Sequence, residues 1–162
     1  MTHGASAAAE VLEALRVRRW RLGVAESLTG GALTSELVSV PGASDVLRGA
    51  VVAYATDLKA SLLGVDAGLL EREGPVHPEV AIQMARGVRI ATTTGARGTE
   101  VGVSTTGVAG PDPQDGAPVG RVYVAVATPD GEWVREHDLA GDRAAIRRDA
   151  VAAALTLLRI SL

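Results

Sequence analysis

The sequence contains no cysteine, no phenylalanine and no asparagine among its 162 residues, and it contains a single lysine, Lys59. Without cysteine there is no disulfide, no thiolate metal ligand and no cysteine nucleophile, and the chain suits the reducing cytoplasm, where we expect it to reside. The first ten residues lack the basic region and apolar run of a secretion signal. The longest apolar stretches, around residues 49–55 and 122–128, fall well short of the roughly 20 residues that cross a bilayer, so we expect no contact with a membrane.

Aromatic residues and excess positive charge are also scarce. Phe, Trp and Tyr make up 2% of the chain, and the formal net charge is −3. Surfaces that bind nucleic acid are normally basic and often offer aromatic side chains on which bases stack. This composition disfavours a nucleic-acid adaptor, whereas binding of a small anion stays open.

Arginine supplies fifteen of the sixteen basic residues, a bias that indicates a genome with G+C-rich codons. In such a chain arginine is the usual residue at a surface position that needs only a positive charge. The lone Lys59 therefore has two explanations, chance retention or a chemical role. A chemical role is available because a buried lysine can lose its proton, whereas an arginine effectively cannot.

Hydrophobic periodicity predicts one α/β domain over residues 1–162. The sheet is expected to be mixed and mostly parallel, with a late antiparallel hairpin around Pro129-Asp130-Gly131. The strand at 48–55 shows no alternation, which predicts burial on both faces. Helical patterns lie at residues 6–19, 32–40, 56–64, 65–73, 79–94 and from 141 onward, and strand patterns at 21–25, 48–55, 99–106, 121–128 and 132–139.

The stretch from Val24 to Gly31 runs from an apolar strand into a Ser/Thr/Gly turn that a helix follows. The two glycines let the backbone approach a ligand closely, and the first N–H groups of the helix point back at the turn. Ser27 places a hydroxyl in this setting. The alternative is that Ser27 is an ordinary helix N-cap.

Two further strand exits carry polar or glycine-rich residues. Lys59 falls in the first turn after the strand that ends near Tyr54, and the strand at 99–106 runs directly into Gly-Val-Ala-Gly-Pro at 107–111. Ligands in open α/β sheets bind at the carboxyl ends of strands, so the three exits are expected to line one crevice. The loop at 112–120 is then a lid or rim, and an ordinary loop is the alternative for the 107–111 segment.

A serine nucleophile needs a base, and the histidines are poorly placed to provide one. His3 is expected in a frayed terminus, His77 in a structural link between two prolines, and His137 in the late hairpin. Burial of Lys59 would lower its pKa from about 10.4 towards 7 or 8, where a lysine acts as a general base. The pair Ser27 and Lys59 therefore predicts amide or ester hydrolysis without a metal, and no histidine or carboxylate stands at metal-ligand spacing beside His77.

Other groups complete this hypothesis. Backbone N–H groups of the glycine-rich turns would stabilise an oxyanion, while the hydroxyls of Thr106 and Ser104 would orient the lysine or the leaving group. Arg143 opens the terminal helix, where the helix dipole favours anions over cations. This misfit is explained if Arg143 and the helix end receive an anionic ligand together.

Six segments carry a resemblance to a known family. In chain order they resemble the C-terminal domain of the CinA family over nearly the whole sequence, and the pairing of AES-x-TGG with GVAGP is especially specific. The segments are AESLTGG (25–31), VVAYATDLKASLLGV (51–65), GPVHPEVAIQMARGVR (74–89), STTGVAGPDP (104–113), PVGRVYVAVAT (118–128) and GDRAAIRRDAV (141–151).

The resemblance implies a three-layer α/β/α sandwich and an activity. Members of the family include nicotinamide mononucleotide amidases, which release ammonia and nicotinic acid mononucleotide in pyridine-nucleotide salvage. By motif, Ser27 becomes the nucleophile, Lys59 its base, Tyr54 and Thr106 supporting groups, and Arg143 a substrate-binding cation. No cofactor is implied. Further substrate contacts are expected from Thr29, Gly30, Gly31, Ser104, Gly107 and Gly110.

Other readings stay open. A nucleotide-binding or regulatory module would keep the same pocket without turnover. Two-domain members of the family carry an additional N-terminal domain that resembles molybdopterin-binding proteins, and we expect this chain to lack it. A homodimer or higher homo-oligomer is expected, because the edge of the late hairpin is free to pair with a second copy.

Overall fold

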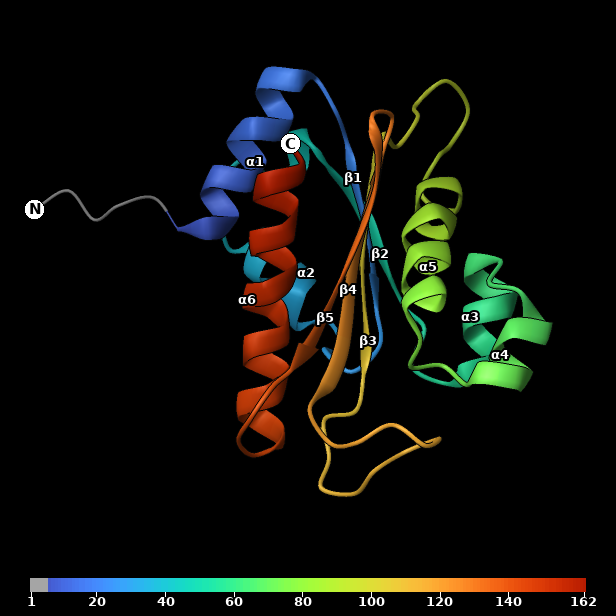
Figure 1. Cartoon of the computed structure of the whole chain (residues 1–162). Helices are drawn as coiled ribbons and strands as arrows, with labels where there is room; N and C mark the ends of the chain where they lie inside the picture. The colour runs from blue at the N-terminus through green and yellow to red at the C-terminus, as the bar shows by residue number, and fades with distance from the viewer. Residues whose placement is uncertain (1–5) are drawn as a thin grey trace, which may run out of the picture.

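The computed structural model describes residues 6–162, which form a sheet with helices on both faces (Figure 1). The elements follow the expected order, and their ends differ from the expected ends by a few residues. They are α1 (Ala7–Arg18), β1 (Leu22–Glu26), α2 (Ala32–Val38), the 3-10 helix η1 (Ala43–Asp45), β2 (Leu47–Val52), α3 (Thr56–Leu63), α4 (Ala67–Glu73), α5 (Pro78–Ala91), β3 (Val101–Gly107), β4 (Arg121–Thr128), β5 (Gly131–Asp138) and α6 (Arg143–Ser161).

The five strands of the described chain are ordered β2-β1-β3-β4-β5. β1 pairs in parallel with both β2 and β3, whereas β4 pairs antiparallel with β3 and β5. Four strands therefore share one direction and β4 runs against them. This confirms the mixed, mostly parallel sheet with a late antiparallel hairpin.

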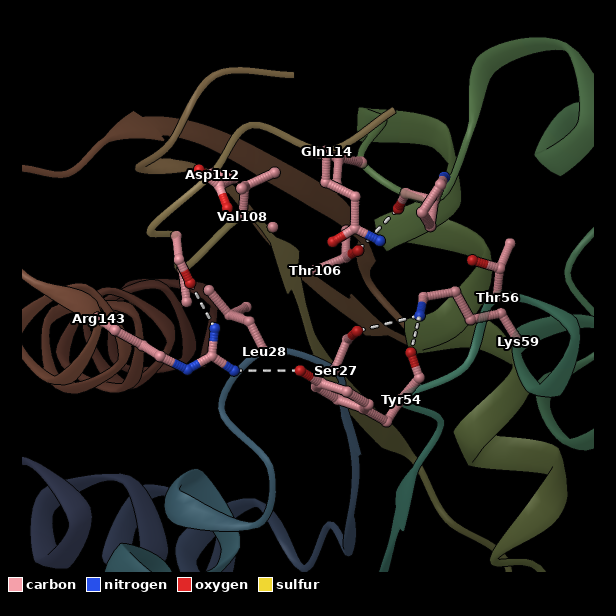
Figure 2. A pocket seen from close by; sticks show the side chains of 15 residues that line it. Ser27, Leu28, Tyr54, Thr56, Lys59, Thr106, Val108, Asp112, Gln114 and Arg143 are labelled. Atoms are coloured by element: carbon pink, nitrogen blue, oxygen red, sulfur yellow. Dashed lines mark hydrogen bonds between the residues drawn. The ribbon is translucent and has the colours of Figure 1, made fainter. Parts of the chain in front are cut away.

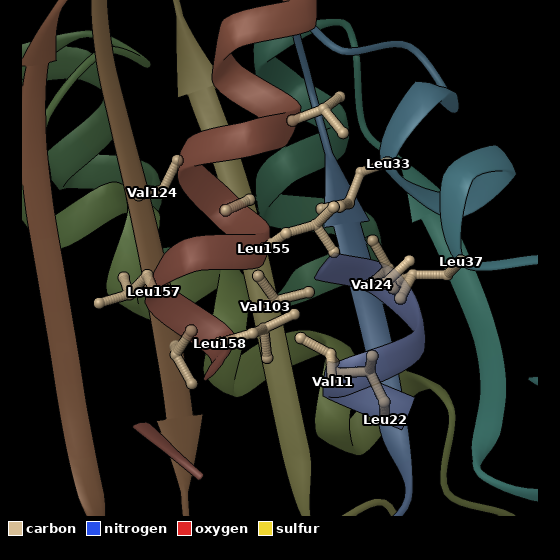
Figure 3. Close-up of a cluster of buried hydrophobic side chains, with 14 of the residues drawn as sticks. Val11, Leu22, Val24, Leu33, Leu37, Val103, Val124, Leu155, Leu157 and Leu158 are labelled. Atoms are coloured by element: carbon tan, nitrogen blue, oxygen red, sulfur yellow. The ribbon is translucent and has the colours of Figure 1, made fainter. Parts of the chain in front are cut away.

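The helices form two layers, with α1, α2 and α6 on one face of the sheet and α3, α4 and α5 on the other (Figure 1). Strand pleating divides the apolar side chains between the layers. On β4, Val122, Val124 and Val126 belong to the larger core under α6 (Figure 3), while Ala125 and Ala127 pack with residues of α5. The three-layer α/β/α sandwich is confirmed.

Small residues let α5 lie directly on the sheet and on α3. A Cβ added to Gly102 of β3 would stand 1.9 Å from the carbonyl oxygen of Ala85, and one added to Gly87 would stand 1.8 Å from that of Leu63. Neither distance is possible between real atoms. Glycine at these two positions therefore allows α5 to lie close to β3 and to α3.

Two local expectations were wrong. β2 is an edge strand that pairs only with β1. Its residues are half-buried or exposed, so the run at 48–55 is not covered on both faces as expected. The sequence Thr56-Asp57 also predicts a cap for the helix at 56–64, but the residue that caps α3 is Ala55, which makes no side-chain cap bond, and Thr56 lies inside the helix. Continuous apolar sequence did not distinguish an edge strand from a central one.

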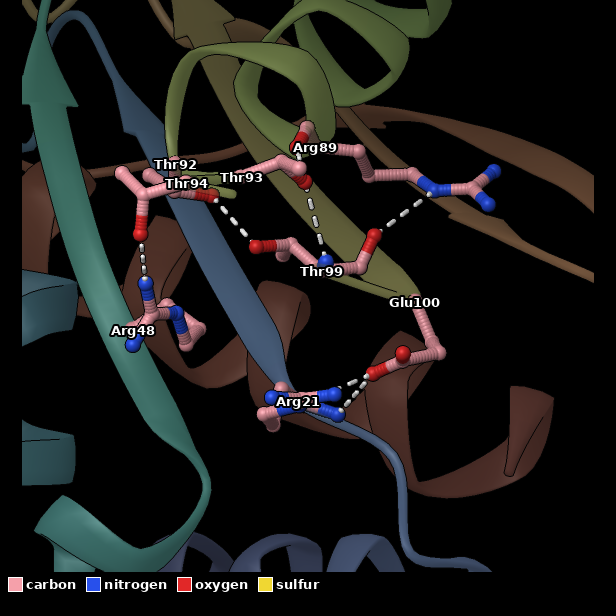
Figure 4. A network of polar contacts seen from close by, with 8 residues as sticks. All are labelled: Arg21, Arg48, Arg89, Thr92, Thr93, Thr94, Thr99 and Glu100. Carbon is pink, nitrogen blue, oxygen red and sulfur yellow. Dashed lines mark hydrogen bonds and ion pairs between the residues drawn. The ribbon is translucent and has the colours of Figure 1, made fainter. Parts of the chain in front are cut away.

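A polar network ties the amino-terminal ends of β1 and β3 together (Figure 4). Glu100 accepts a hydrogen bond from the backbone N–H of Arg21 at 2.7 Å, and the Thr93 hydroxyl accepts one from the N–H of Thr99 at 3.0 Å. This end of the sheet is closed by its own side chains. The opposite, carboxyl end is where a cavity opens.

No helix among residues 6–162 is long and apolar enough to span a bilayer.

Candidate active site

A polar cavity of about 220 Å³ opens at the carboxyl ends of β1 and β3, beside α3 and the start of α6 (Figure 2). The three strand exits and the 112–120 loop all contribute to it, as the sequence predicts. The lining residues are Ser27, Leu28, Tyr54, Thr56, Lys59, Pro75, Val76, Thr106, Gly107, Val108, Ala109, Gly110, Asp112, Gln114 and Arg143.

Ser27 and Lys59 meet at the floor of this cavity. Lys59 Nζ lies 3.0 Å from Ser27 Oγ and also donates to the carbonyl oxygen of Ala53 at 2.8 Å. Ser27 follows the last residue of β1, and Lys59 stands in the first turn of α3, which the chain enters from β2. The connection between the two parallel neighbours β1 and β2 therefore places Lys59 against Ser27.

Burial lowers the pKa of Lys59 from 10.5 to about 8, because the charged form loses its hydration. The side chain is 1% exposed, and its hydrogen-bond partners are a hydroxyl and backbone carbonyls rather than a carboxylate. A substantial fraction of the amine is thus neutral slightly above neutral pH. Neutral Lys59 can accept the proton of Ser27, which is the requirement for a general base.

The start of α2 is filled by a side chain of the protein itself. The fully buried carboxylate of Glu26 accepts hydrogen bonds from the N–H groups of Gly31 at 2.9 Å, Leu33 at 3.2 Å and Thr34 at 2.8 Å. These are the donors that the sequence suggested for a ligand. Neither Gly30 nor Gly31 lines the cavity, so their expected contact with substrate is not supported: an internal anion occupies the helix end.

Thr29 and Ser104 also lie away from the cavity. The Thr29 hydroxyl lies 2.8 Å from that of Thr105, and the Ser104 hydroxyl donates to the carbonyl oxygen of Ala81 at 2.6 Å. Both residues are fully buried. Their hydroxyls hold neighbouring segments together and do not line the cavity, so the expected contact with a substrate is not supported for either residue.

Thr106 does line the cavity, although its hydroxyl is already engaged. It donates to the carbonyl oxygen of Pro75 at 2.7 Å and so anchors the segment before α5 to the end of β3. Gly107 and Gly110 continue the same wall. The structure thus places Thr106 across the cavity from Lys59 without a direct bond between them (Figure 2).

Arg143 and Tyr54 form a bridge at the rim (Figure 2). The Arg143 guanidinium donates to the carbonyl oxygen of Gly110 at 2.6 Å and to the Tyr54 hydroxyl at 3.1 Å. Asp142 caps the same helix through the N–H of Ala145 at 2.8 Å. The rim therefore carries a cation held by a carbonyl and a phenol, with no carboxylate of the described chain in ion-pair contact with it.

Several lining residues had no signal in the sequence strong enough to single them out. Leu28, Thr56 and Val76 lie within the quoted segments but are residue types that did not single them out, and Asp112 and Gln114 lie on the loop that was expected only as a rim. Their positions depend on how the loops fold back over the strand ends.

The histidines stay apart from this site. His77 accepts a hydrogen bond from the N–H of Glu79 at 3.2 Å and caps α5, as expected for a structural residue. His137 lies on β5 opposite Val122. His3 lies outside the described residues. Among residues 6–162, no three His, Asp or Glu side chains are grouped so that they could hold a metal ion.

Fold and site together define a class: an α/β/α sandwich domain with a buried serine–lysine pair at the carboxyl ends of its parallel strands. Residues 4–162 match the family model described as the CinA C-terminal domain. The chain therefore belongs to the CinA C-terminal domain family.

Individual relatives agree with this assignment. A CinA-like protein of Frankia casuarinae is 50% identical over 149 residues, which is 92% of this chain and 33% of that protein. A putative competence-damage inducible protein of Desulforamulus reducens is 44% identical over 85% of this chain and 32% of its own length. The chain thus spans about a third of the curated relatives that it matches.

Solved structures share the fold over almost their full length. A CinA superfamily protein of Klebsiella pneumoniae superposes with a TM-score of 0.88 and 28% identity, covering 96% of this chain and 94% of that one. One from Escherichia coli gives a TM-score of 0.86 and 29% identity, over 96% and 90%.

Proposed function

We propose that this chain is an amidohydrolase that converts nicotinamide mononucleotide to nicotinic acid mononucleotide and ammonia. The observation that carries the proposal is the 3.0 Å contact between the buried, depressed-pKa amine of Lys59 and the hydroxyl of Ser27, inside a cavity. A lysine has little reason to be buried without a carboxylate partner unless its neutral form is used. The resemblance to family members with this activity supplies the substrate.

In the proposed reaction, neutral Lys59 takes the proton of Ser27 while Oγ bonds to the carboxamide carbon. The tetrahedral intermediate collapses when protonated Lys59 gives its proton to the nitrogen, the C–N bond breaks and ammonia leaves. A water molecule, deprotonated by Lys59, then attacks the ester carbon. Cleavage of the ester returns the proton to Ser27 and releases the carboxylic acid.

The other lining groups take supporting roles in this proposal. Backbone N–H groups in the Gly107–Gly110 wall stabilise the oxyanion, except that of Val108, which donates to the carbonyl oxygen of Arg121 at 2.9 Å. Thr106 keeps this wall in place through Pro75. Arg143 binds the anionic part of the nucleotide, with Tyr54 orienting its guanidinium. No metal or cofactor takes part in these steps.

The test measures ammonia release by the wild-type protein from a small panel of pyridine carboxamides: nicotinamide mononucleotide, the riboside and free nicotinamide. We expect release from the mononucleotide and much slower release from compounds without the phosphate, because these offer Arg143 no anion. If the protein releases ammonia from none of the three compounds, the proposal is contradicted. Thermal stabilisation by the mononucleotide without product would instead identify a binding module.

A further inference from the structure

Arg147 holds the nucleophile turn from behind. Its Nε donates to the carbonyl oxygen of Leu28 and its Nη2 to that of Thr29, both at 2.9 Å. These are the two residues that follow Ser27. Arg147 itself lies in α6, one helical turn after Arg143, and it does not line the cavity.

The two bonds fix the turn in a way that a single contact would not. The planar guanidinium fork engages two consecutive carbonyls, so it restrains the orientation of both peptide planes next to the nucleophile. The other side of the turn is held by Thr105, whose hydroxyl lies 2.8 Å from that of Thr29 and 3.5 Å from the Ser27 N–H. Arg147 ties the turn to the α6 layer through two hydrogen bonds.

The surroundings of Arg147 indicate that its fork matters more than its charge. Among the described residues, no carboxylate lies within ion-pair distance of Arg147. Its neighbour Arg148 differs: that side chain is 72% exposed and pairs only with Asp149. Arg148 is thus an ordinary surface cation, whereas Arg147, the preceding residue on the same helix, is half-buried and binds two backbone carbonyls.

We infer that Arg147 is a positioning residue, which orients Ser27 towards Lys59 by clamping the carbonyls of Leu28 and Thr29. The inference rests on the proposed role of Ser27 as nucleophile. It extends that role to a residue that touches neither substrate nor Lys59. It also makes α6 a single support for both the rim cation and the nucleophile turn.

The experiment compares Arg147→Met and Arg147→Lys with the wild type, and Arg148→Met is the matched control on the next residue. Two rates are measured: ammonia release from nicotinamide mononucleotide, resolved into kcat and KM, and modification of Ser27 by a fluorophosphonate, followed by intact mass. In the second reaction Lys59 takes the Ser27 proton, the Oγ–P bond forms, the P–F bond breaks and fluoride leaves, so the rate reports nucleophile geometry without the natural substrate. Ser27→Ala identifies the modified residue, and circular dichroism gives the folded fraction.

We expect both Arg147 variants to lose about 100-fold in kcat and in modification rate, with KM little changed, because misplacing a reacting atom by about 1 Å has that effect. Arg147→Lys keeps the positive charge but lacks the planar fork, so its kcat and modification rate should fall as far as those of Arg147→Met. If Arg147→Met does not fold, Arg147→Lys alone is compared with the wild type. Arg148→Met should match the wild type.

Wild-type rates in Arg147→Lys would overturn the clamp. If the fluorophosphonate modifies Ser27 of the wild type but the wild type releases no ammonia, the proposed substrate is refuted. The role of Arg147 is then decided by the modification rates of the variants alone. A wild type that does neither would refute both, because Ser27 would then not be an activated nucleophile.

Discussion

Lys59 is a cationic side chain in an almost fully buried place, and its surroundings favour the neutral form. Two carbonyls and one hydroxyl take its hydrogen bonds, and burial lowers its pKa to about 8. An ion pair would have held the proton on the amine instead. This arrangement supports the proposed exchange of a proton between Lys59 and Ser27.

The first prediction concerns the pH dependence of activity. Because the proposed base must be neutral, kcat/KM for ammonia release should rise through about pH 8 and level off above it. A profile measured from about pH 6 to pH 9.5 checks this. Activity that is flat or falling across this range would show that Lys59 does not act as the base.

The second prediction concerns stability. Between pH about 8 and 10.5 the unfolded chain holds the Lys59 proton while the folded chain has lost it, so the free energy of unfolding rises with pH in this window. The full difference in pKa corresponds to about 3 kcal/mol. Urea unfolding of wild type and Lys59→Met as a function of pH isolates this contribution, and the variant should be more stable below pH 8.

The control for this prediction is the difference between the free energies of unfolding of the two proteins at each pH, because the contributions of titrating groups that both proteins share cancel. Equal pH slopes for wild type and Lys59→Met would contradict the depressed pKa of the buried amine.

Residue chemistry could be predicted where composition and position agreed. The only lysine, next to a strand exit, pointed to Lys59, and the strand-to-helix turn pointed to Ser27. Thr29 and Ser104 stand in the same motifs, yet their side chains face the interior because of strand pleating and turn conformation. The sequence did not predict that the Glu26 carboxylate accepts hydrogen bonds from the start of α2. A glutamate at the end of a strand does not by itself indicate that its side chain turns back onto the next helix.

Among the elements, α5 shows how backbone proximity limits substitution. Gly87→Ala in a helix interior ordinarily stabilises by about 1 kcal/mol. Here the new Cβ would stand 1.8 Å from the Leu63 carbonyl oxygen, so α5 and α3 would have to separate. We expect a net destabilisation of about 1 to 3 kcal/mol, measured by urea unfolding.

Gly49→Ala in β2 is the control for this prediction. An added Cβ there would lie 3.7 Å from Cγ2 of Thr92, which is an ordinary van der Waals contact. Its stability should stay within about 0.5 kcal/mol of wild type. Equal effects of the two substitutions would argue against close α3–α5 packing.

Element types could be predicted from periodicity, and element environments could not. The strong amphipathic spacing of α5 and the Pro-Asp-Gly turn between β4 and β5 gave the right structures. The burial of β2 was misjudged because β2 is the first strand of the sheet order, with β1 as its single neighbour, and its residues are half-buried or exposed. Strand order is a long-range property that local patterns do not contain.

At the scale of the whole molecule, the site exists only in the folded chain. Ser27, Lys59, Thr106 and Arg143 span more than a hundred residues of sequence and come from both helical layers and the sheet between them. Activity and circular dichroism should therefore be lost at the same urea concentration, as expected for one cooperative domain. Loss of activity well before loss of secondary structure would show that the rim unfolds separately.

The most direct measurement compares ammonia release from nicotinamide mononucleotide by the wild type and by Ser27→Ala, with thermal stabilisation by the same nucleotide recorded on both. Ser27 lies at the cavity floor and its replacement removes one hydroxyl, so the fold and nucleotide binding should persist. The account predicts release by the wild type, loss of at least about 1,000-fold in the variant, and similar stabilisation of both proteins. Release by Ser27→Ala at a rate close to wild type would contradict it.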